Sequence, residues 1–309
     1  MSSSLRLSVP DITDPNQAAA FFRIADAARG ADGYDPFNEQ TRIDLDAGRR
    51  RPLLAHAANS DTALAAAAVG SGQLALVVHP DHRGARVGTA VLEEILAGHG
   101  GAGELLAWSH GDHPAARALG ASHHFEPVRT LLQLRLAPLP EFDADAAQAA
   151  GPAQIAIESF RPGADEEEWV ALNARIFSAH PEQGKLTVED LRARQREPWF
   201  DADDFLVARD ATGQMVGYNW LKIDDEADLA AGSADARSGE IYVIGVEAAS
   251  AGHGLGRALM HAGLNRMRDR RCAEVTLYVE SDNTAAVRLY RSLGFADHTI
   301  DVQYRRPPR

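Results

Sequence analysis

The sequence has little cysteine, no long apolar run and no excess of positive charge, and each shortage excludes a class of protein. Cys272 is the only cysteine, which excludes an intramolecular disulfide framework. No stretch reaches the roughly 18 apolar residues of a membrane-spanning helix, and the first residues, MSSSLRLSVPD, lack the apolar core of a signal peptide. We therefore expect a cytoplasmic protein without a membrane partner.

The charge balance restricts the partners further. A formal net charge of −13 argues against nucleic acid or an anionic membrane as the main partner and slightly favours a cationic substrate such as an amine. With 45% hydrophobic and 24% charged residues, the composition is that of a folded globular protein. The sequence leaves the oligomeric state open, and a monomer is compatible with it.

The length of 309 residues predicts two domains, since one domain usually takes roughly 100 to 200. Residues 139–154, LPEFDADAAQAAGPAQ, mix Pro, Ala, Gly and acids without periodicity, which is typical of a linker. We place an N-terminal domain at 1–140, the linker at 141–153 and a C-terminal domain at 154–309.

The two halves resemble each other. A shift of 168 residues lays Leu74–Gly88 on Tyr242–Gly256, so that a strand, a loop and a final glycine superimpose. A shift of 170 aligns six further identities, which in the first half are Asp112, Ala115, Ala116, Leu119, Ser122 and Phe125. The chain therefore reads as a duplication of one domain.

The strongest local signal lies in the second half. A β-rich run, Ile241–Val246, is followed by AGHGLGR, residues 251–257, which opens a helix. Glycines in such a turn let backbone N–H groups approach an anion such as a pyrophosphate at the positive end of the helix. Tight packing or another nucleotide motif would give a similar turn, although the Rossmann and P-loop spacings are absent.

A second strand and helix follow at residues 274–295, EVTLYVESDNTAAVRLYRSLGF. Asp282 or Asn283 can cap the helix, and Gly294 suits its left-handed end. Asn283, Val287 and Tyr290 share one stripe of the helix, so a ligand over the helix start would meet Asn283 first and the phenol later. Tyr290 could equally be a core aromatic with its hydroxyl at the rim.

These two segments resemble the GNAT (GCN5-related N-acetyltransferase) superfamily. The resemblance implies an α+β fold with two tandem GNAT (acyl-CoA N-acyltransferase) domains, each a mixed sheet flanked by helices. It implies acetyl-CoA as cosubstrate, no metal, and direct acetyl transfer to a primary amine. In the family the pantetheine lies between two splayed parallel strands, a strand N–H near Val246 receives the thioester oxygen, and a tyrosine at the place of Tyr290 commonly protonates the CoA thiolate.

The resemblance also implies which residues hold CoA. In the second half these are the strand end, the glycine loop and the two helix starts, namely Ile244, Gly245, Val246, Ala251, Gly252, His253, Gly254, Leu255, Gly256, Arg257, Asn283, Thr284, Ala285, Ala286, Val287 and Arg288. The first-half counterparts are Val77, Val78, His79, Ala85, Arg86, Val87, Gly88, Thr89 and Ala90.

Further stretches resemble the mycothiol synthase family, among them HPEQG at 180–184, EPWFD at 197–201, YNWLK at 218–222 and GEIYV at 239–243. That family acetylates the cysteinyl amine of a glucosaminyl-inositol precursor. The resemblance implies Glu240 as the base, Tyr290 as the acid, and substrate contacts from Glu39, Glu182, Lys222, Glu240 and Tyr278. On the sequence alone, each of these acids, and Lys222, could instead be an ordinary solvated or turn residue.

The sequence departs from the family pattern in places. Ala251 stands where a Gln or Arg commonly opens the loop, and a polar insertion separates Lys222 from Glu240. In the first half Arg86 replaces the first loop glycine, while Gly72 and Gly120 stand opposite Glu240 and Tyr290. We therefore expect a catalytically degenerate first domain, and the sequence does not settle whether it still holds CoA.

Two other features have ordinary explanations. His110, His113, His123 and His124 do not form a zinc-like ligand set, so we expect solvated or helix-start histidines and no metal. Cys272 follows three arginines, but a half-buried structural residue is favoured over a reactive thiol. The alternatives to a mycothiol synthase are an acetyltransferase for another amine, such as a protein N-terminus or an aminosugar, and a non-catalytic acyl-CoA-binding module.

Overall fold

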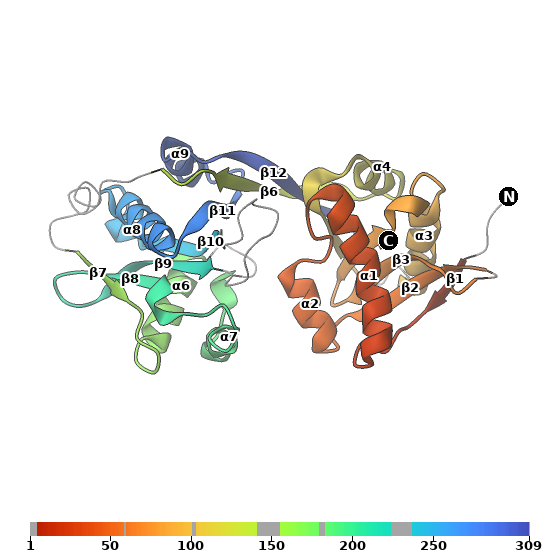
Figure 1. Cartoon of the computed structure of the whole chain (residues 1–309), viewed down its shortest axis with the longest axis horizontal. Coiled ribbons are helices and arrows are strands. Elements are labelled where there is room, and N and C mark those ends of the chain that lie inside the picture. Colours follow the sequence, from red (N-terminus) through yellow and green to blue (C-terminus); the bar gives the residue numbers. More distant parts are fainter. Residues whose placement is uncertain are drawn as a thin grey trace. The chain divides into compact units, whose positions relative to one another are not determined.

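The computed structural model describes residues 5–58, 60–100, 103–140, 155–178, 183–223 and 237–308. They form two compact units, shown in Figure 1. Unit 1 contains Met1–Leu132 together with Thr299–Arg309, and unit 2 contains Gln133–His298. The units therefore differ from the sequence boundaries at 140 and 154, because the last residues of the chain pack with the first half.

Unit 1 is a mixed sheet with helices on both faces. Its strands lie in the order β1-β2-β3-β4-β5-β12, and only β4 and β5 are parallel. The elements are β1 (Leu5–Ser8), α1 (Pro15–Asp32), α2 (Glu39–Asp46), β2 (Arg51–Ala57), β3 (Ala63–Gly70), β4 (Gln73–Val78), α3 (Val87–His99), β5 (Leu105–Ser109), α4 (Pro114–Ser122) and the end of β12 (Ala296–Arg306).

Strand β3 explains why both faces of this sheet are covered. Its run of alanines is buried throughout, and alternate residues point to opposite faces. Ala65 and Ala67 pack in one cluster with α3, while Ala66 and Ala68 pack in another with α1. Two apolar faces on one strand require a helix layer on each side.

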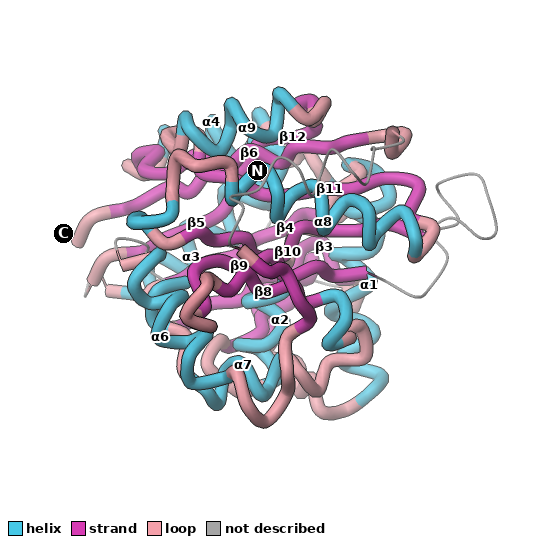
Figure 2. The backbone as a smooth tube through the Cα atoms, turned by 90° about the vertical axis from the view of Figure 1, so that its left-hand side faces the viewer, coloured by secondary structure: helices cyan, strands magenta, loops and turns pink. Residues whose placement is uncertain are grey.

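Unit 2 repeats this plan, with strands in the order β6-β11-β10-β9-β8-β7 and with β10 parallel to β11. Helix α8 packs on β8 to β11 and α6 packs on β9 and β10, as the tube in Figure 2 also shows. The elements are the end of β6 (Glu126–Leu136), β7 (Ala156–Ser159), α6 (Glu166–Ile176), α7 (Val188–Arg194), β8 (Phe205–Arg209), β9 (Met215–Ile223), β10 (Arg237–Val246), α8 (Leu255–Asp269), β11 (Cys272–Glu280) and α9 (Thr284–Ser292).

The predicted duplication is visible in the element boundaries. Helices α4 and α9, and strands β6 and β12, begin and end at positions offset by 170 residues. The short 3-10 turns Pro80–His82 and Ala248–Ser250 are offset by 168, the value found from the sequence. The tandem α+β fold is thereby confirmed.

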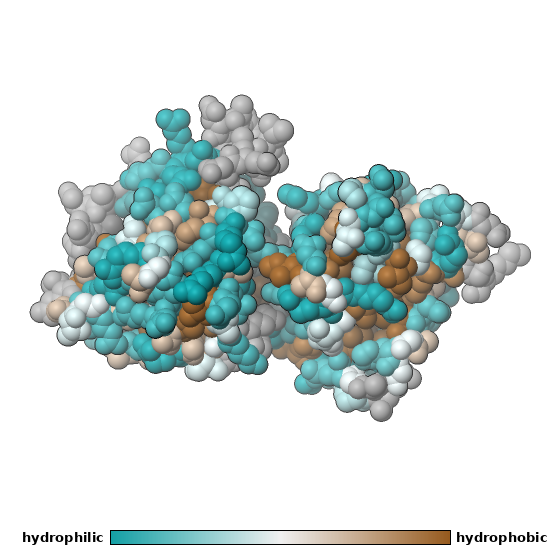
Figure 3. Space-filling model, turned by 90° about the horizontal axis from the view of Figure 1, so that it is seen from below, coloured by the Kyte–Doolittle hydropathy of each residue, from teal (hydrophilic) through white to brown (hydrophobic). Residues whose placement is uncertain are grey.

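The surfaces of the two units differ in character. Four of the five large apolar side chains that are exposed in the described residues belong to unit 1, namely Val9, Ile43, Val128 and Ile300. On the face seen in Figure 3, the larger brown apolar patches lie on the right, over unit 1. Within the described ranges, no helix is both long enough and apolar enough to cross a bilayer.

Candidate active site

The two parallel strands of unit 2 separate at the place where the sequence predicts CoA. Pairing between β10 and β11 ends at Ile241 with Leu277, although β10 continues to Val246 and β11 to Glu280. On its other side β10 stays paired with β9 as far as Val246. The edge of β10 from Tyr242 to Val246 therefore keeps backbone groups that the sheet does not use.

The glycine loop enters helix α8 in the conformation that the sequence suggested. Gly254 is the N-cap of α8, with φ of 87°, in the left-handed region that favours glycine. No side chain caps this helix start, so first-turn N–H groups stay available for an anion. Ala251 has no polar side chain, so any phosphate contact at this position must come from the backbone.

The predicted CoA segments meet at Gly256. A Cβ added there would lie 3.6 Å from Leu289 of α9 and 3.8 Å from Val246 of β10. Arg257 binds Ser292 of α9 through a 2.7 Å hydrogen bond. The end of β10, the loop and α9 thus adjoin one another, as the resemblance requires.

Helix α9 carries the predicted acid. Its N-cap is Asn283, whose side chain accepts a hydrogen bond from Ala286 N at 3.2 Å, so this asparagine is in part a capping residue. Gly294, with φ of 95°, follows the helix in the left-handed conformation predicted for it. Tyr290 is only 6% exposed, and burial raises the pKa of its phenol to about 12. The phenol is therefore fully protonated at neutral pH.

The predicted base and the predicted substrate cation are direct neighbours. Glu240 of β10 lies opposite Lys222 of β9 and opposite Thr276 of β11. Lys222 Nζ sits 5.1 Å from the Trp199 ring centre and 5.9 Å from that of Tyr242. The insertion between Lys222 and Glu240 left this pairing open in the sequence, and the strand register decides it.

Other predicted substrate residues have different placements. Tyr278 is 44% exposed on β11 and accepts a hydrogen bond from Gln133 Nε2 at 2.8 Å. Glu39 lies in unit 1, at the first position of α2. Glu182 lies outside the described residues.

The sequence did not single out the buried network next to Glu182. Asn173, fully buried, donates to Gln183 O at 2.6 Å and accepts from the Tyr218 hydroxyl at 2.7 Å. Gly184 has no room for a side chain, since a Cβ would lie 2.2 Å from Phe177 O. These contacts fix the segment that follows Glu182. The only sequence signal for this segment was the HPEQG stretch itself.

Trp199 and Tyr242 were also missed as members of the site, although both lie in stretches that carry the family resemblance. Tyr242 is the extra residue at the irregularity where β10 pairs with β9, between Ile241 and Val243. Its hydroxyl accepts a 3.1 Å hydrogen bond from Arg194 Nε. Alternation along a strand cannot place such a residue.

Unit 1 repeats this local geometry in altered form. Pairing between β4 and β5 is confined to Gln73 with Leu106 and Leu74 with Ala107, after which both strands continue unpaired with each other. Arg86 is the N-cap of α3 with φ of 63°, so it holds the left-handed conformation of Gly254 without being glycine. A Cβ on Gly88 would contact Val78 at 3.4 Å and Leu119 at 3.8 Å, repeating the surroundings of Gly256.

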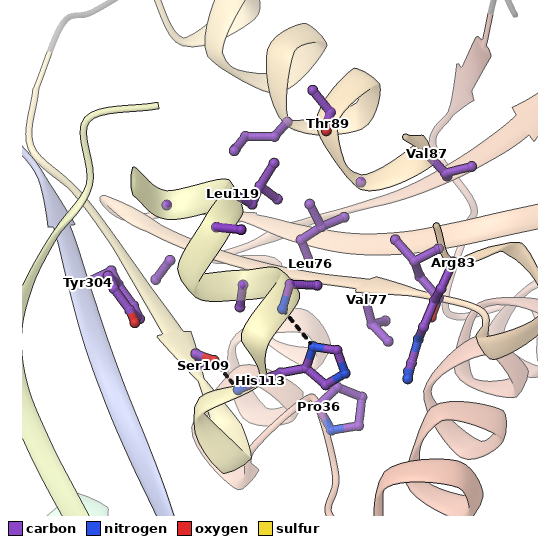
Figure 4. A pocket seen from close by; sticks show the side chains of 18 of the residues that line it. Pro36, Leu76, Val77, Arg83, Val87, Thr89, Ser109, His113, Leu119 and Tyr304 are labelled. Carbon is purple, nitrogen blue, oxygen red and sulfur yellow. Dashed lines mark hydrogen bonds between the residues drawn. The ribbon is translucent and has the colours of Figure 1, made fainter. Parts of the chain in front are cut away.

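A cavity of about 520 Å³ occupies this place in unit 1 and is shown in Figure 4. Its lining is mostly apolar and includes Val77, Leu76, Thr89 and Leu119. Arg83, the basic residue that opens the loop, is bound by both oxygens of Asp32, at 2.7 and 2.8 Å. Its charge is therefore already paired within the protein.

The remaining chemical groups have structural roles. Cys272 is 6% exposed, and burial raises the pKa of its thiol to about 11, which keeps it protonated and unreactive. His113 caps α4 by accepting from Ala115 N at 3.1 Å, as expected of a helix-start histidine. His123 bonds the Leu119 carbonyl at 3.0 Å. In the described residues no three His, Cys, Asp or Glu side chains gather as a metal site.

Comparison with known proteins agrees with this architecture. Residues 168–295, within unit 2, match the acetyltransferase (GNAT) family. A GCN5-related N-acetyltransferase from Sphaerobacter thermophilus superimposes with a TM-score of 0.69 and 25% identity, covering 99% of this chain and 96% of that one. A tandem GNAT protein from the clavulanic acid biosynthesis pathway has a TM-score of 0.70, 16% identity and 99% coverage of both chains.

Curated relatives share far more of the sequence. A mycothiol acetyltransferase from Clavibacter sepedonicus is 46% identical, covering 94% of this chain and 93% of its own length. Another from Thermobispora bispora is 44% identical, with 94% and 97% coverage. A third from Parafrankia sp. is 41% identical over the whole of both chains.

Proposed function

Because the chain belongs to the mycothiol acetyltransferase family of tandem GNAT proteins, we propose that it completes mycothiol by acetylating an amine. The donor is acetyl-CoA, and the acceptor is the cysteinyl amine of 1D-myo-inositol 2-(L-cysteinylamino)-2-deoxy-α-D-glucopyranoside. The observation that carries this is the identity of 41 to 46% with mycothiol acetyltransferases over almost the whole chain.

The geometry of unit 2 supports CoA binding there. The unused edge of β10 beyond Ile241 suits the amide groups of a pantetheine arm, and the uncapped start of α8 suits a pyrophosphate. The residues that hold CoA are accordingly Ile244 to Val246, the loop 251–257 and the start of α9, residues 283–288. A backbone N–H at the end of β10 would receive the thioester oxygen as negative charge develops on it.

Glu240 is proposed as the base. A primary α-amine has a reference pKa of about 7.7 to 8.0, so at neutral pH most of it carries a proton that must leave before attack. Glu240 accepts that proton, directly or through water. Lys222 lies opposite it and binds hydroxyl oxygens of the sugar or inositol, while Tyr278, Glu182 and Glu39 make further substrate contacts. For Glu39 and Glu182 this role rests on the family resemblance alone.

Tyr290 is proposed to assist the leaving thiolate. A thiol has a reference pKa of about 8.5, below the phenol value of about 12 in this protein. Complete proton transfer from the phenol would therefore be unfavourable by about 3 to 4 pKa units. The phenol acts mainly by donating a hydrogen bond to the sulfur as the C–S bond breaks.

The test is to incubate the full chain with acetyl-CoA and one of three acceptors, and to follow acetylated product by mass spectrometry. The acceptors are the cysteinyl glycoside, an aminosugar and a peptide with a free N-terminus. We expect rapid product formation with the glycoside only. Faster acetylation of either other amine would assign a different substrate, and binding of acetyl-CoA without any product would indicate a non-catalytic module.

A further inference from the structure

The cavity of unit 1 contains a polar pair that the duplication does not explain. His110 lines the cavity and follows β5. Its Nδ1 lies 2.7 Å from Asp301 Oδ2, and both side chains are largely buried, with 13% and 8% exposed. The ring also stacks on Trp108 at 6.2 Å. This histidine is therefore held in one orientation at the cavity wall.

The partner fixes which nitrogen of His110 carries the proton. An ionised carboxylate can only accept hydrogen bonds, so Nδ1 must donate to Asp301. In the neutral ring Nε2 then keeps its lone pair, which is the state required of a general base. The other oxygen of Asp301 accepts from Gly111 N at 3.0 Å, so the carboxylate is itself anchored.

The ring of Tyr304 packs against Gly120, the position where unit 1 lacks the tyrosine of unit 2. Gly120 corresponds to Tyr290, and a Cβ on Gly120 would lie 3.5 Å from Cδ1 of Tyr304. Tyr304 also lines the cavity, as Figure 4 shows. The Tyr304 hydroxyl donates to Asp112 Oδ1 at 3.3 Å. Desolvation and this carboxylate raise the pKa of the phenol above its ordinary value, so Tyr304 stays protonated.

The Asp301 carboxylate and the Tyr304 phenol both come from β12, the strand whose end belongs to unit 1. The 170-residue shift places Leu131 and Leu134 opposite Asp301 and Tyr304. The fold therefore accepts leucine at both positions, and unit 1 has carboxylate and phenol there instead. A strand that served only for packing would not need a carboxylate and a phenol at these two positions.

We propose that unit 1 is a second acyl-thioester site, in which His110 activates water for hydrolysis. This requires that residues 85–90 of unit 1 hold CoA, as the family resemblance implies, in addition to the CoA proposed for unit 2. Water attacks the thioester carbon while His110 Nε2 takes a proton from it. The C–O bond forms, the C–S bond breaks, and the thiolate receives its proton through the Tyr304 phenol or the His110 imidazolium. The products are a carboxylic acid and CoA.

The charges around the cavity favour water over an amine as acceptor. Asp32 is the only carboxylate among the described residues that line it, and both its oxygens are bound to Arg83. An ammonium group would find no carboxylate left to pair with it there. A neutral acceptor meets no such obstacle, since the rest of the wall is mostly apolar.

The experiment measures release of CoA thiol from acetyl-CoA without any amine, in the full chain carrying Glu240→Gln so that amine transfer is suppressed. His110→Gln should reduce the rate in excess of the spontaneous one by about 100-fold, the lower range for a positioned proton-transfer group. His110→Gly should regain part of the rate when imidazole is added. His124→Asn is the matched control and should leave the rate unchanged, because His124 is exposed, is not among the residues that line the cavity, and has a φ of 63°, a conformation that asparagine tolerates.

Asp301→Asn separates chemistry from folding. An asparagine Oδ1 can still accept from Gly111 N, but its amide group donates to His110 Nδ1 and leaves the proton on Nε2, the wrong tautomer for a base. We expect at least a tenfold loss with an unchanged unfolding temperature. A full rate in Asp301→Asn or in His110→Gln would overturn the proposal.

Calorimetric titration with CoA distinguishes the two possible failures. We expect two CoA molecules per chain, and one in Gly88→Glu, where an acidic side chain enters the loop of unit 1. A stoichiometry of one in the unaltered chain would refute CoA binding by unit 1, and the inference with it. Two bound CoA molecules with no release above the spontaneous rate would refute hydrolysis alone.

Discussion

At the scale of single residues, the environment of Tyr290 decides how large its contribution is. The phenol is buried and its pKa is raised to about 12, so it is a weak acid but an undiminished hydrogen-bond donor across the neutral range. Tyr290→Phe should lower kcat about 10- to 100-fold, at or below the lower end of the span for proton-transfer groups. Steady-state rates with saturating acetyl-CoA would measure this, and a wild-type kcat would leave Tyr290 a packing residue.

The same burial links Tyr290 to alkaline stability. Its folded pKa of about 12 lies above the unfolded value of about 10, so the folded state favours the neutral phenol. This contribution is complete below about pH 10 and is lost as the pH rises toward 12. It amounts to about 3 kcal/mol for a shift of two units. Tyr290→Phe should therefore lose less stability than the wild type between pH 10 and 12 in denaturant titrations.

Glu240 gives a complementary prediction at the other end of the reaction. Glu240→Gln keeps the size of the side chain but removes the proton acceptor, so kcat should fall by roughly 10²- to 10⁴-fold. Lys222→Met, at the opposing strand position, should instead raise KM for the glycoside more than it lowers kcat, as loss of uniform binding does. A KM effect in Glu240→Gln together with a kcat effect in Lys222→Met would contradict both assigned roles.

At the scale of elements, the two helix starts form a natural pair for comparison. Gly254 and Arg86 both cap a helix in the left-handed conformation, which costs a non-glycine residue roughly 1 to 2 kcal/mol. Arg86 is exposed, so Arg86→Gly should stabilise unit 1 by up to about 1 kcal/mol once the entropy of glycine in the unfolded chain is deducted. Gly254→Ala should destabilise unit 2 by about 1 kcal/mol.

Gly256→Ala is the control for that comparison. Gly256 is not among the residues with positive φ, and its added Cβ would make only an ordinary contact at 3.6 Å with Leu289. Scanning calorimetry should therefore find its stability near the wild-type value. Equal losses in Gly254→Ala and Gly256→Ala would mean that crowding, and not backbone conformation, selects glycine in this loop.

Local chemistry explains which elements could be predicted from sequence. The glycine turn before α8 and the left-handed Gly294 depend on neighbouring residues, and both were predicted correctly. For the cap of α9 the sequence offered Asp282 or Asn283, and the structure selects Asn283. The pairing of Glu240 with Lys222 depends on the register across an insertion and on the irregularity at Tyr242. Neither property has a local signature, because alternation fixes the face of a side chain but not its partner.

At the scale of the whole molecule, the partner of strand β12 likewise could not be predicted from the sequence. Residues 301 to 304 are all buried, and their apolar and polar mixture does not reveal which sheet receives them. The sequence therefore suggested a second domain continuous to residue 309, whereas Thr299–Arg309 pack in unit 1. The pairing of Val302–Arg306 with β5 joins residues about two hundred positions apart. Only the completed sheet specifies it.

Because unit 1 includes residues from the C-terminal end of the chain, we predict that residues 1–140 alone will not form a stable domain. Ending the chain after His298 removes Val302 and Tyr304 from the core of unit 1, together with the β5 ladder. Burial of each side chain stabilises by about 1.5 to 3 kcal/mol, so the total loss approaches the 5 to 15 kcal/mol that usually holds a domain folded. Hydrogen exchange should show β4 and β5 unprotected in the truncated chain. A chain ending after Arg306 should keep full protection, because Pro307 and Pro308 are exposed and lie outside β12. Addition of a peptide spanning residues 296–308 should restore protection to the 1–140 fragment, and a fragment already protected without the peptide would show that unit 1 does not depend on its last strand.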